Sequence, residues 1–159
     1  TRKITKAVAN ITTAIERGEE FTPLQLGNVG AKRDWSDSED FMAGVWLMLN
    51  QEEPKEYILS SNETHTVKEF VSLAFQEAGI AGLWSGEGLD EKFMIYQENK
   101  ILAEVNEEFY RPAEVAILHG DSNPIREELG WEPKFSFLDL VTRMVNNDLE
   151  ISKKRAFSP

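Results

Sequence analysis

Hydrophobic residues recur at helical spacing from the start of the chain. Between residues 3 and 17 they fall three or four positions apart, at Ile4, Val8, Ile11 and Ile15. Side chains with that spacing lie on one face of an α-helix. Gly18 follows directly, and glycine commonly ends a helix. The pattern predicts a helix over 3–17 with one buried face.

Two capping boxes predict two further helices. In a capping box, a serine or threonine and the glutamate three residues later satisfy each other's backbone N–H groups. Ser36 with Glu39 makes one such pair, and Thr66 with Glu69 makes the other. The apolar face of the first predicted helix consists of Phe41, Val45, Met48 and Leu49. That of the second consists of Phe70, Leu73 and Ala74, and this helix is expected to end at Gly79.

The sequence pattern of the C-terminal third predicts a short helix followed by a long one. Asp121 or Ser122 is a suitable cap for the short helix, which has Pro124 in its first turn and Gly130 after its end. This is the usual placement of both residue types. Ser136 is expected to start the last helix, whose apolar positions are Leu140, Val141, Met144, Val145 and Leu149.

Short apolar runs between these helices predict three strands, over 24–26, 57–59 and 101–105. Residues 80–100 lack a clear period and contain Gly82, Gly86 and Gly88, so we expect loops there. The predicted fold is therefore α/β and mixed, with helices predominant. We find no repeat and no linker, so residues 1–159 are expected to form one domain.

Composition excludes several classes of protein. The chain has 159 residues and no cysteine, which rules out disulfides, thiolate zinc sites and cysteine nucleophiles. Its net charge of −11 argues against nucleic-acid binding, which draws on neutralised phosphates. The longest apolar run, 44–49, is far shorter than the ~20 residues of a membrane span. No basic segment followed by an apolar run marks a signal peptide, and we expect a cytoplasmic location with no membrane partner.

Motifs for catalysis or coenzyme binding are missing. The sequence has no Gly-x-Gly-x-x-Gly, no phosphate-binding P-loop and no Gly-x-Ser-x-Gly elbow. His65 and His119 are far apart in the sequence, and nothing else supports a metal site. Tyr96 and Lys100 match Tyr-x-x-x-Lys, but no glycine-rich turn precedes them and a loop is expected there. We interpret that match as chance.

Two clusters combine basic residues with glycine or proline. The first runs from Leu26 to Trp35 and contains Lys32 and Arg33; the second runs from Phe109 to Val115 and contains Arg111 and Glu114. Arginine guanidinium groups bind phosphate oxygens in pairs, and a carboxylate accepts protons from a ribose diol. Two arginines and one glutamate therefore fit a nucleoside diphosphate.

Surface ion pairs are the alternative explanation of both clusters. Arg33 has Asp34 and Asp37 nearby in the sequence, and Arg111 has Glu107, Glu108 and Glu114. Exposed pairs of this kind are common in a chain this charged, and they contribute little to stability. Residue spacing by itself leaves this reading open.

The same clusters resemble the extended short-chain dehydrogenase/reductases, and closely the GDP-mannose 4,6-dehydratase family. The similar segments, in order, are Thr1–Ile4, Leu26–Asn28 with Ala31–Trp35, Trp46–Leu49, Glu63–Phe70, Phe109–Val115, Gly120–Asp121, and Leu129–Trp131 with Pro133. Each segment is modest alone, but their order and spacing are specific. The resemblance covers nearly the whole chain.

This resemblance implies a function and a set of binding residues. It implies that Arg33 and Arg111 bind the diphosphate of GDP-mannose and that Glu114 holds the ribose hydroxyls. It places Asn28, Lys32 and Lys3 at the guanosine end. The family converts GDP-mannose to GDP-4-keto-6-deoxymannose, on the path to GDP-fucose, with NADP recycled. Its members are dimers or tetramers, so a homo-oligomer is expected for the full protein.

The departures from the family are equally specific. The family's glycine-rich NADP turn and its catalytic Thr-x-Glu and Tyr-x-x-x-Lys groups would lie before Thr1. The resemblance therefore implies a C-terminal substrate-binding portion without its Rossmann half, inactive alone and exposing apolar surface. The segment 36–41 is acidic where the family is usually basic, Pro124 stands where a lysine is usual, and 86–104 diverges.

Three alternative functions remain at this point. The chain could belong to an enzyme acting on another sugar nucleotide, such as an epimerase. It could be a non-catalytic nucleotide-sugar binding subunit. It could also be an acidic interaction domain in which both arginine clusters are structural. Base preference and the ability to bind any sugar nucleotide would separate these alternatives.

Overall fold

The computed structural model describes residues 1–111, 113 and 115–156, with a mixed α/β fold as predicted. Its helices are α1 (Arg2–Arg17), α2 (Ser38–Leu49), α3 (Val67–Glu77), α4 (Asn123–Leu129) and α5 (Phe137–Ala156). Its strands are β1 (Leu24–Leu26), β2 (Lys32–Arg33), β3 (His65–Thr66), β4 (Leu83–Ser85), β5 (Lys92–Ile95), β6 (Lys100–Val105) and β7 (Ile117–Leu118). Three single-turn 3-10 helices are η1 (Gly88–Asp90), η2 (Tyr96–Glu98) and η3 (Glu107–Phe109).

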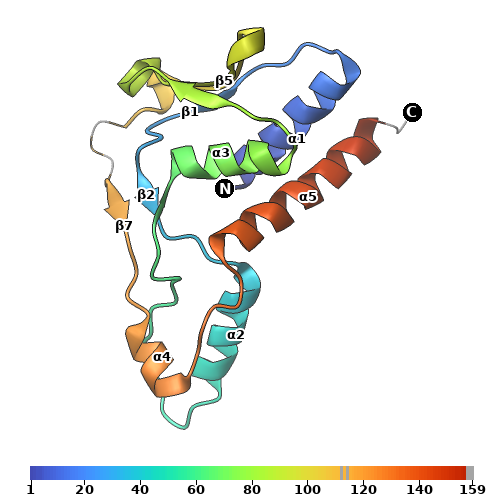
Figure 1. Cartoon of the computed structure of the whole chain (residues 1–159). Helices are drawn as coiled ribbons and strands as arrows, with labels where there is room; N and C mark the ends of the chain where they lie inside the picture. Colours follow the sequence, from blue (N-terminus) through green and yellow to red (C-terminus); the bar gives the residue numbers. More distant parts are fainter. Residues whose placement is uncertain (112, 114, 157–159) are drawn as a thin grey trace.

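The strands form two sheets. The larger has the order β1-β6-β5-β4, with β1 parallel to β6 and the other pairs antiparallel. The smaller has the order β3-β2-β7, with β2 antiparallel to β3 and parallel to β7. Figure 1 shows α1, α3 and α5 together beside the larger sheet, and α2 with α4 in a separate lower part.

We call the first group, α1, α3, α5 and the larger sheet, the body. Its core contains Val8 of α1, Phe70 of α3 and Val141 of α5, none of which is accessible to solvent. Phe93 and Leu102 add the contribution of the larger sheet. The apolar faces predicted for these helices are therefore buried against one another, which supplies the main driving force for folding.

The second group, α2, residues 50–60 and α4, is called the lobe. Trp131 anchors it, because its indole Nε1 donates to the Asp40 carbonyl at 2.9 Å. The buried Asp40 carboxylate in turn accepts from the backbone N–H groups of Lys134 and Phe135. A side chain at Gly44 would collide with Leu59 and Trp131, so glycine permits this close packing.

Most predicted helix ends are confirmed. Gly18 adopts a left-handed conformation at the end of α1, and Gly130 does so at the end of α4. Both hydrogen bonds of the Thr66–Glu69 capping box are present. The capping box at Ser36 is wrong, because Asp37 caps α2 by accepting from the Glu39 N–H at 2.9 Å. Ser122, rather than Asp121, occupies the cap position of α4.

Two other predictions fail for a common reason. Residues 57–59, expected as a strand, form none, and Ile58 is 58% exposed. Residues 80–100, expected as loops, contain β4, β5 and two 3-10 turns. Strand formation depends on a partner elsewhere in the chain, which a local pattern does not reveal.

Leu49 also departs from its predicted burial. It was placed on the apolar face of α2 but is 77% exposed. Met42 and Trp46, on the same helix, are exposed as well. Among the described residues, no helix is long and apolar enough to cross a membrane.

Candidate functional site

The end of β1 and the turn after β6 meet at one place. The Asn106 backbone N–H donates to the Leu26 carbonyl at 2.7 Å, and its side-chain amide donates to Gln25 at 3.1 Å. The Asn106 side-chain oxygen also accepts from the Glu108 N–H at 2.9 Å. These bonds attach η3 to the end of β1 across about 80 residues of sequence.

Gly27 allows the two segments to touch. A Cβ atom at this position would overlap the carbonyl oxygen of Phe109. Any other residue would push η3 away from β1, so glycine is required here by close backbone approach. The two clusters noted in the sequence are thereby brought side by side.

A cavity of about 360 Å³ opens where they meet, and we call it the Gly27 pocket. It is lined by Thr1, Lys3, Ile4, Leu26, Gly27, Asn28, Trp35, Val67, Glu108, Phe109 and Arg111. Three of the six predicted binding residues, Lys3, Asn28 and Arg111, therefore share one cavity. The pocket combines two cationic side chains with two aromatic rings.

Local contacts fix the orientation of two of these residues. The Lys3 ammonium lies 4.2 Å from the centre of the Phe109 ring, a cation–π arrangement. The Asn28 side-chain oxygen accepts from the Gly30 N–H at 2.9 Å, which tightens the loop after β1. Arg111 is exposed and forms no ion pair with Glu107 or Glu108 within the described chain.

Lys32 and Arg33 lie on β2, outside the lining of the Gly27 pocket. The Arg33 guanidinium donates to the carbonyls of Val115 at 2.9 Å and of Lys32 at 2.7 Å. Lys32 is exposed. Glu114, the predicted ribose ligand, lies outside the described residues. Lys3, Asn28 and Arg111 therefore lie together in the Gly27 pocket. Lys32 and Arg33 lie outside its lining, on the neighbouring strand β2.

The carboxylates offered as partners of Arg33 have other roles. Asp34 accepts from the Ser61 N–H, the Ser61 hydroxyl and the Asn62 N–H at 2.7–3.1 Å. It therefore fixes the turn that leads to β3. Trp35, the next residue, stacks on Phe137 with ring centres 5.7 Å apart and forms a firm wall of the pocket.

The acidic segment 36–41 faces α5 rather than the pocket lining. Asp37 and Glu39 pair with the two terminal nitrogens of Arg143 at 3.0 and 2.9 Å. The hydrogen bond to Glu39 raises the pKa of the Arg143 guanidinium. The acidic residues therefore join α2 to α5, and none of 36–41 lines the Gly27 pocket.

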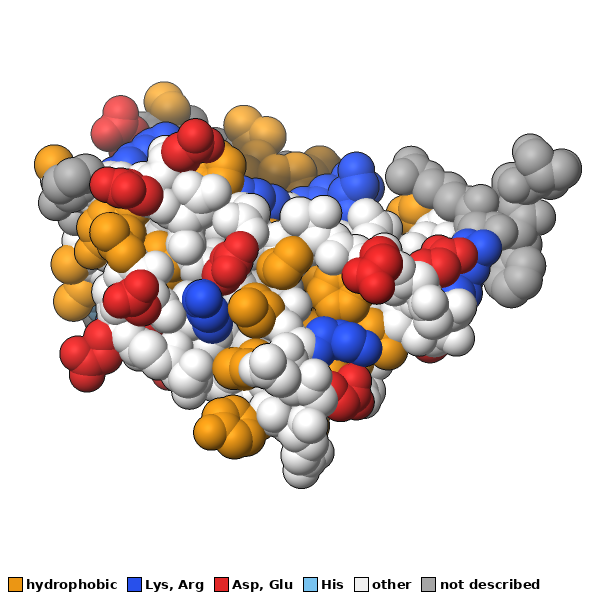
Figure 2. All heavy atoms as spheres, turned by 90° about the horizontal axis from the view of Figure 1, so that it is seen from above, with side chains coloured by type: hydrophobic (Ala, Val, Ile, Leu, Met, Phe, Trp, Pro, Cys, Tyr) orange, Lys and Arg blue, Asp and Glu red, His pale blue; other side chains and the backbone are white. Residues whose placement is uncertain are grey.

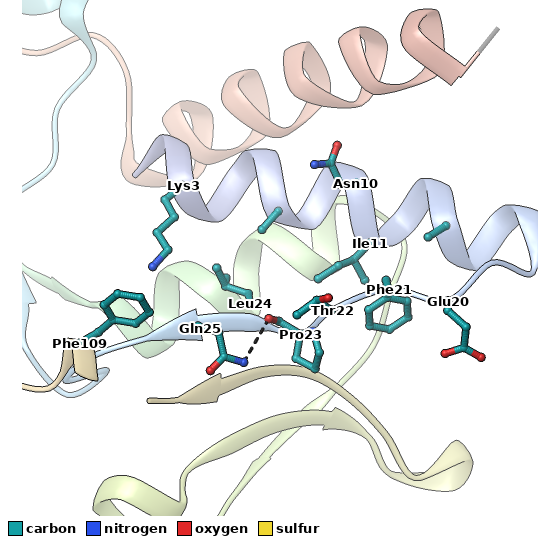
Figure 3. A pocket seen from close by; sticks show the side chains of 12 residues that line it. Lys3, Asn10, Ile11, Glu20, Phe21, Thr22, Pro23, Leu24, Gln25 and Phe109 are labelled. Carbon is teal, nitrogen blue, oxygen red and sulfur yellow. Dashed lines mark hydrogen bonds between the residues drawn. The ribbon is translucent and has the colours of Figure 1, made fainter. Parts of the chain in front are cut away.

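A second cavity, of about 550 Å³, runs along α1 (Figure 3). Figure 3 shows Lys3 and Phe109 at one end of this α1 groove and Phe21 with Glu20 at the other. Its floor is mainly apolar, with Ile11, Pro23 and Leu24. Lys3 and Phe109 line both cavities, so the contact between these two side chains separates the α1 groove from the Gly27 pocket.

Other candidates from the sequence do not form sites. Tyr96 belongs to the η2 turn and Lys100 to β6, so they do not share a helix as a dehydrogenase pair would. Lys100 pairs with Glu98 at 3.2 Å. His65 stacks on Phe137, and no group of three metal-ligating residues occurs in the described parts of the chain.

Sequence reasoning missed three pocket residues, Trp35, Glu108 and Phe109. All three belong to the quoted motifs or stand beside them, but neither an aromatic ring nor one glutamate in an acidic chain signals binding. Their position at the junction of β1 and η3 became evident only with the fold. On the face seen in Figure 2, acidic, basic and hydrophobic side chains are interspersed.

Comparison with solved structures supports the mixed α/β fold. The structure described as RMD from Pseudomonas aeruginosa with NADPH matches 93% of this chain and 43% of its own, with a TM-score of 0.68 and 15% identity. UDP-glucose 4-epimerase from Bifidobacterium longum, with NAD+ and UDP, matches with a TM-score of 0.64 and 16% identity, over 97% of this chain and 41% of its own. At this identity the likeness concerns the fold alone.

Sequence comparison is more specific. The family model for GDP-mannose 4,6 dehydratase matches residues 1–144. The GDP-mannose 4,6 dehydratase of Dictyostelium discoideum is 42% identical over 96% of this chain and 42% of its own length. That of Homo sapiens is 35% identical over 96% and 40%. The chain belongs to the GDP-mannose 4,6-dehydratase family, and it spans about two fifths of the length of the curated relatives it matches.

Proposed function

We propose that this chain is the substrate-binding portion of a GDP-mannose 4,6-dehydratase. The observation that carries the proposal is the meeting of two family motifs at Gly27. Leu26-Gly-Asn28 and the segment around Arg111 are distant in sequence, yet together they line one pocket that also holds Lys3. Cationic donors around a cavity of this size suit a phosphorylated small molecule.

The pocket residues take separate parts of the ligand in this proposal. Arg111 binds the diphosphate, and Arg33 reaches it from the neighbouring strand β2. Glu114 accepts hydrogen bonds from the ribose hydroxyls. Asn28, Lys32 and Lys3 lie at the guanosine end. Because guanidinium groups bind phosphate oxygens in pairs, the arginines contribute most of the affinity.

Within the whole enzyme, the reaction would convert GDP-mannose to GDP-4-keto-6-deoxymannose and water. NADP would supply the hydride acceptor and donor for that conversion. We place the main site for this coenzyme outside the chain. The absence of a glycine-rich turn supports this, as does the position of Tyr96 and Lys100 on different elements. The role of these residues is therefore to bind and orient the sugar nucleotide, and a coenzyme-binding portion must complete the site.

We infer that the exposed apolar side chains of the lobe contact the rest of the enzyme. Met42, Trp46 and Leu49 are 60%, 69% and 77% exposed. Patches of this kind usually mark an interaction surface. A cytoplasmic homo-oligomer, dimer or tetramer, with no nucleic-acid or membrane partner, is the form we propose for the full protein.

A calorimetric titration of the chain with GDP-mannose tests the proposed function. Selective binding is expected, with UDP-glucose as the control for base specificity. Arg111→Ala should weaken binding about tenfold or more, since a charge-assisted hydrogen bond contributes ~1.5–3 kcal/mol. Equal affinity for UDP-glucose would favour an enzyme acting on another sugar nucleotide. Failure of a natively folded chain to bind either would contradict the proposal.

The chain alone is expected to give no dehydratase turnover. The substrate pocket can be present while the hydride acceptor is not held beside it. Incubation of the purified chain with GDP-mannose and NADP, followed by analysis of the sugar nucleotides, checks this. Formation of the 4-keto-6-deoxy product by the chain would contradict the assigned division of roles.

A further inference from the structure

Glu108 stands on a turn that the fold holds firmly at the Gly27 pocket. Its N–H donates to the Asn106 side chain at 2.9 Å, and the next N–H, of Phe109, donates to the Asn106 carbonyl at 3.0 Å. Asn106 is itself bonded to Leu26 and Gln25. The backbone that carries the Glu108 carboxylate is therefore positioned before any ligand arrives.

The chemistry of this carboxylate differs from that of its neighbours. Lys3 and Arg111, which line the same pocket, are cations, and the guanidinium of Arg111 is suited to a diphosphate. An ionised carboxylate only accepts hydrogen bonds, and it repels phosphate oxygens. No residue in the described chain pairs with the Glu108 carboxylate or donates to it. Glu108 is thus suited to a part of the ligand that presents N–H or O–H donors.

We propose that Glu108 determines base specificity by accepting two hydrogen bonds from the Watson–Crick edge of guanine. The N1–H and the 2-amino group of guanine point in parallel, and the two oxygens of one carboxylate match that spacing. Phe109, next in the chain and 47% exposed, offers a ring on which the base can stack. This inference rests on the proposed function, because it assumes that the pocket takes a guanosine nucleotide.

Other bases do not present the same pair of donors. Hypoxanthine keeps N1–H but lacks the 2-amino group, so it can make one of the two bonds. Adenine places a lone pair at N1, which a carboxylate repels. Glu108 is exposed in the described chain, so the bound base itself must cover the carboxylate. A covered acceptor discriminates strongly against a ligand that lacks the matching donor. Affinity should therefore fall in the order GDP, IDP, ADP.

The adjacent Glu107 provides a matched control, since it lies on the same turn but does not line the pocket. We would titrate the chain and its Glu108→Gln and Glu107→Gln variants with GDP, IDP, ADP and GDP-mannose by calorimetry. Both variants remove one negative charge near the diphosphate. A general charge effect should tighten binding of every nucleotide by about twofold in both.

The proposed contact predicts weaker binding of guanine nucleotides, the opposite of the charge effect, in the Glu108→Gln variant only. Glu108→Gln should weaken GDP and GDP-mannose about tenfold, weaken IDP about threefold and leave ADP unchanged or slightly tighter. Glu107→Gln should weaken none of them. GDP binding that is unchanged or tighter in Glu108→Gln, or a loss confined to GDP-mannose, would overturn the inference alone. If the unaltered chain binds no nucleotide, the proposed function fails and this inference fails with it.

Discussion

The body and the lobe carry similar hydrophobic patterns, yet they bury them differently. In the body, Val8, Phe70 and Val141 are fully buried against one another. In the lobe, Trp46 and Leu49 of α2 are 69% and 77% exposed. A hydrophobic pattern therefore states which side chains require a partner, while the fold decides whether the described chain provides one. The exposed side chains of α2 form the surface for which we propose a contact outside this chain.

The largest expected effect contrasts one aromatic residue from each region. Phe70→Ala should lower the free energy of unfolding by about 3–5 kcal/mol, because it leaves a cavity in the core. Trp46→Ala should change it by less than about 0.5 kcal/mol, since an exposed side chain loses little contact. Urea unfolding followed by circular dichroism measures both. Similar losses for the two variants would contradict the contrast.

Self-association tests what the exposed residues of the lobe are for. The lone chain is expected to associate weakly or to be marginally stable, because its apolar surface lacks a partner. Trp46→Ser should weaken association about tenfold in sedimentation equilibrium, as expected for losing part of a large apolar contact. Leu83→Ser is the control, since Leu83 is 67% exposed but lies on β4 in the body. A stable monomer that melts cooperatively at high temperature would contradict this expectation.

The contact between α2 of the lobe and α5 of the body should make a smaller contribution to the free energy of unfolding. Asp37 is buried, caps α2 and pairs with Arg143 of α5. Asp37→Ala should lower the free energy of unfolding by about 1 kcal/mol, the usual effect of losing a helix cap. Asp37→Asn keeps a capping oxygen and should lose less. Thermal unfolding of the two variants side by side separates the cap from the ion pair.

The smallest expected effect is on the pH dependence of stability, and it involves residues of the lobe alone. Hydrogen bonds from Lys55 and Tyr57 lower the pKa of Glu128 below its ordinary value of 4.5. A lowered carboxyl pKa stabilises the fold above the unfolded-state value and loses that contribution as pH falls through the folded-state value. Glu128→Gln removes this contribution, so the variant should be slightly less stable than the unaltered chain at pH 7, and the difference should vanish as pH falls below about 4.5. Denaturant titrations across pH 2–7 measure this, and equal acid limbs would contradict it.

Sequence reasoning succeeded where structure is set by local patterns. The helices α1, α3 and α5 and the strands β1 and β6 follow from spacing and caps within a few residues. The two-residue strands β2, β3 and β7 do not, because their pairing involves distant parts of the chain. The hairpin β4–β5 does not either, because residues 80–100 lack a clear hydrophobic period. The segment 57–59 has the composition of a buried strand, but no described strand pairs with it.

The candidate site shows the same division between what local patterns predict and what the fold determines. Lys3, Asn28 and Arg111 were selected from motifs, and they do share a cavity. Their meeting depends on the Asn106–Leu26 hydrogen bond and on the missing side chain at Gly27, which no spacing rule contains. From the sequence, Glu108 is only a candidate ion-pair partner of Arg111, because one more acidic residue carries no binding signal in a chain with 28 of them.

The most direct test of the account is to map where GDP-mannose binds by nuclear magnetic resonance. Titration of the labelled chain should shift the backbone amides of residues 26–28, 108, 109 and 111, which line the Gly27 pocket. The amide signals of Asn10 and Glu20, which line the α1 groove and not the Gly27 pocket, should keep their chemical shifts. Shifts confined to the α1 groove, or no shifts at millimolar GDP-mannose, would contradict the claim that the Gly27 pocket holds the sugar nucleotide.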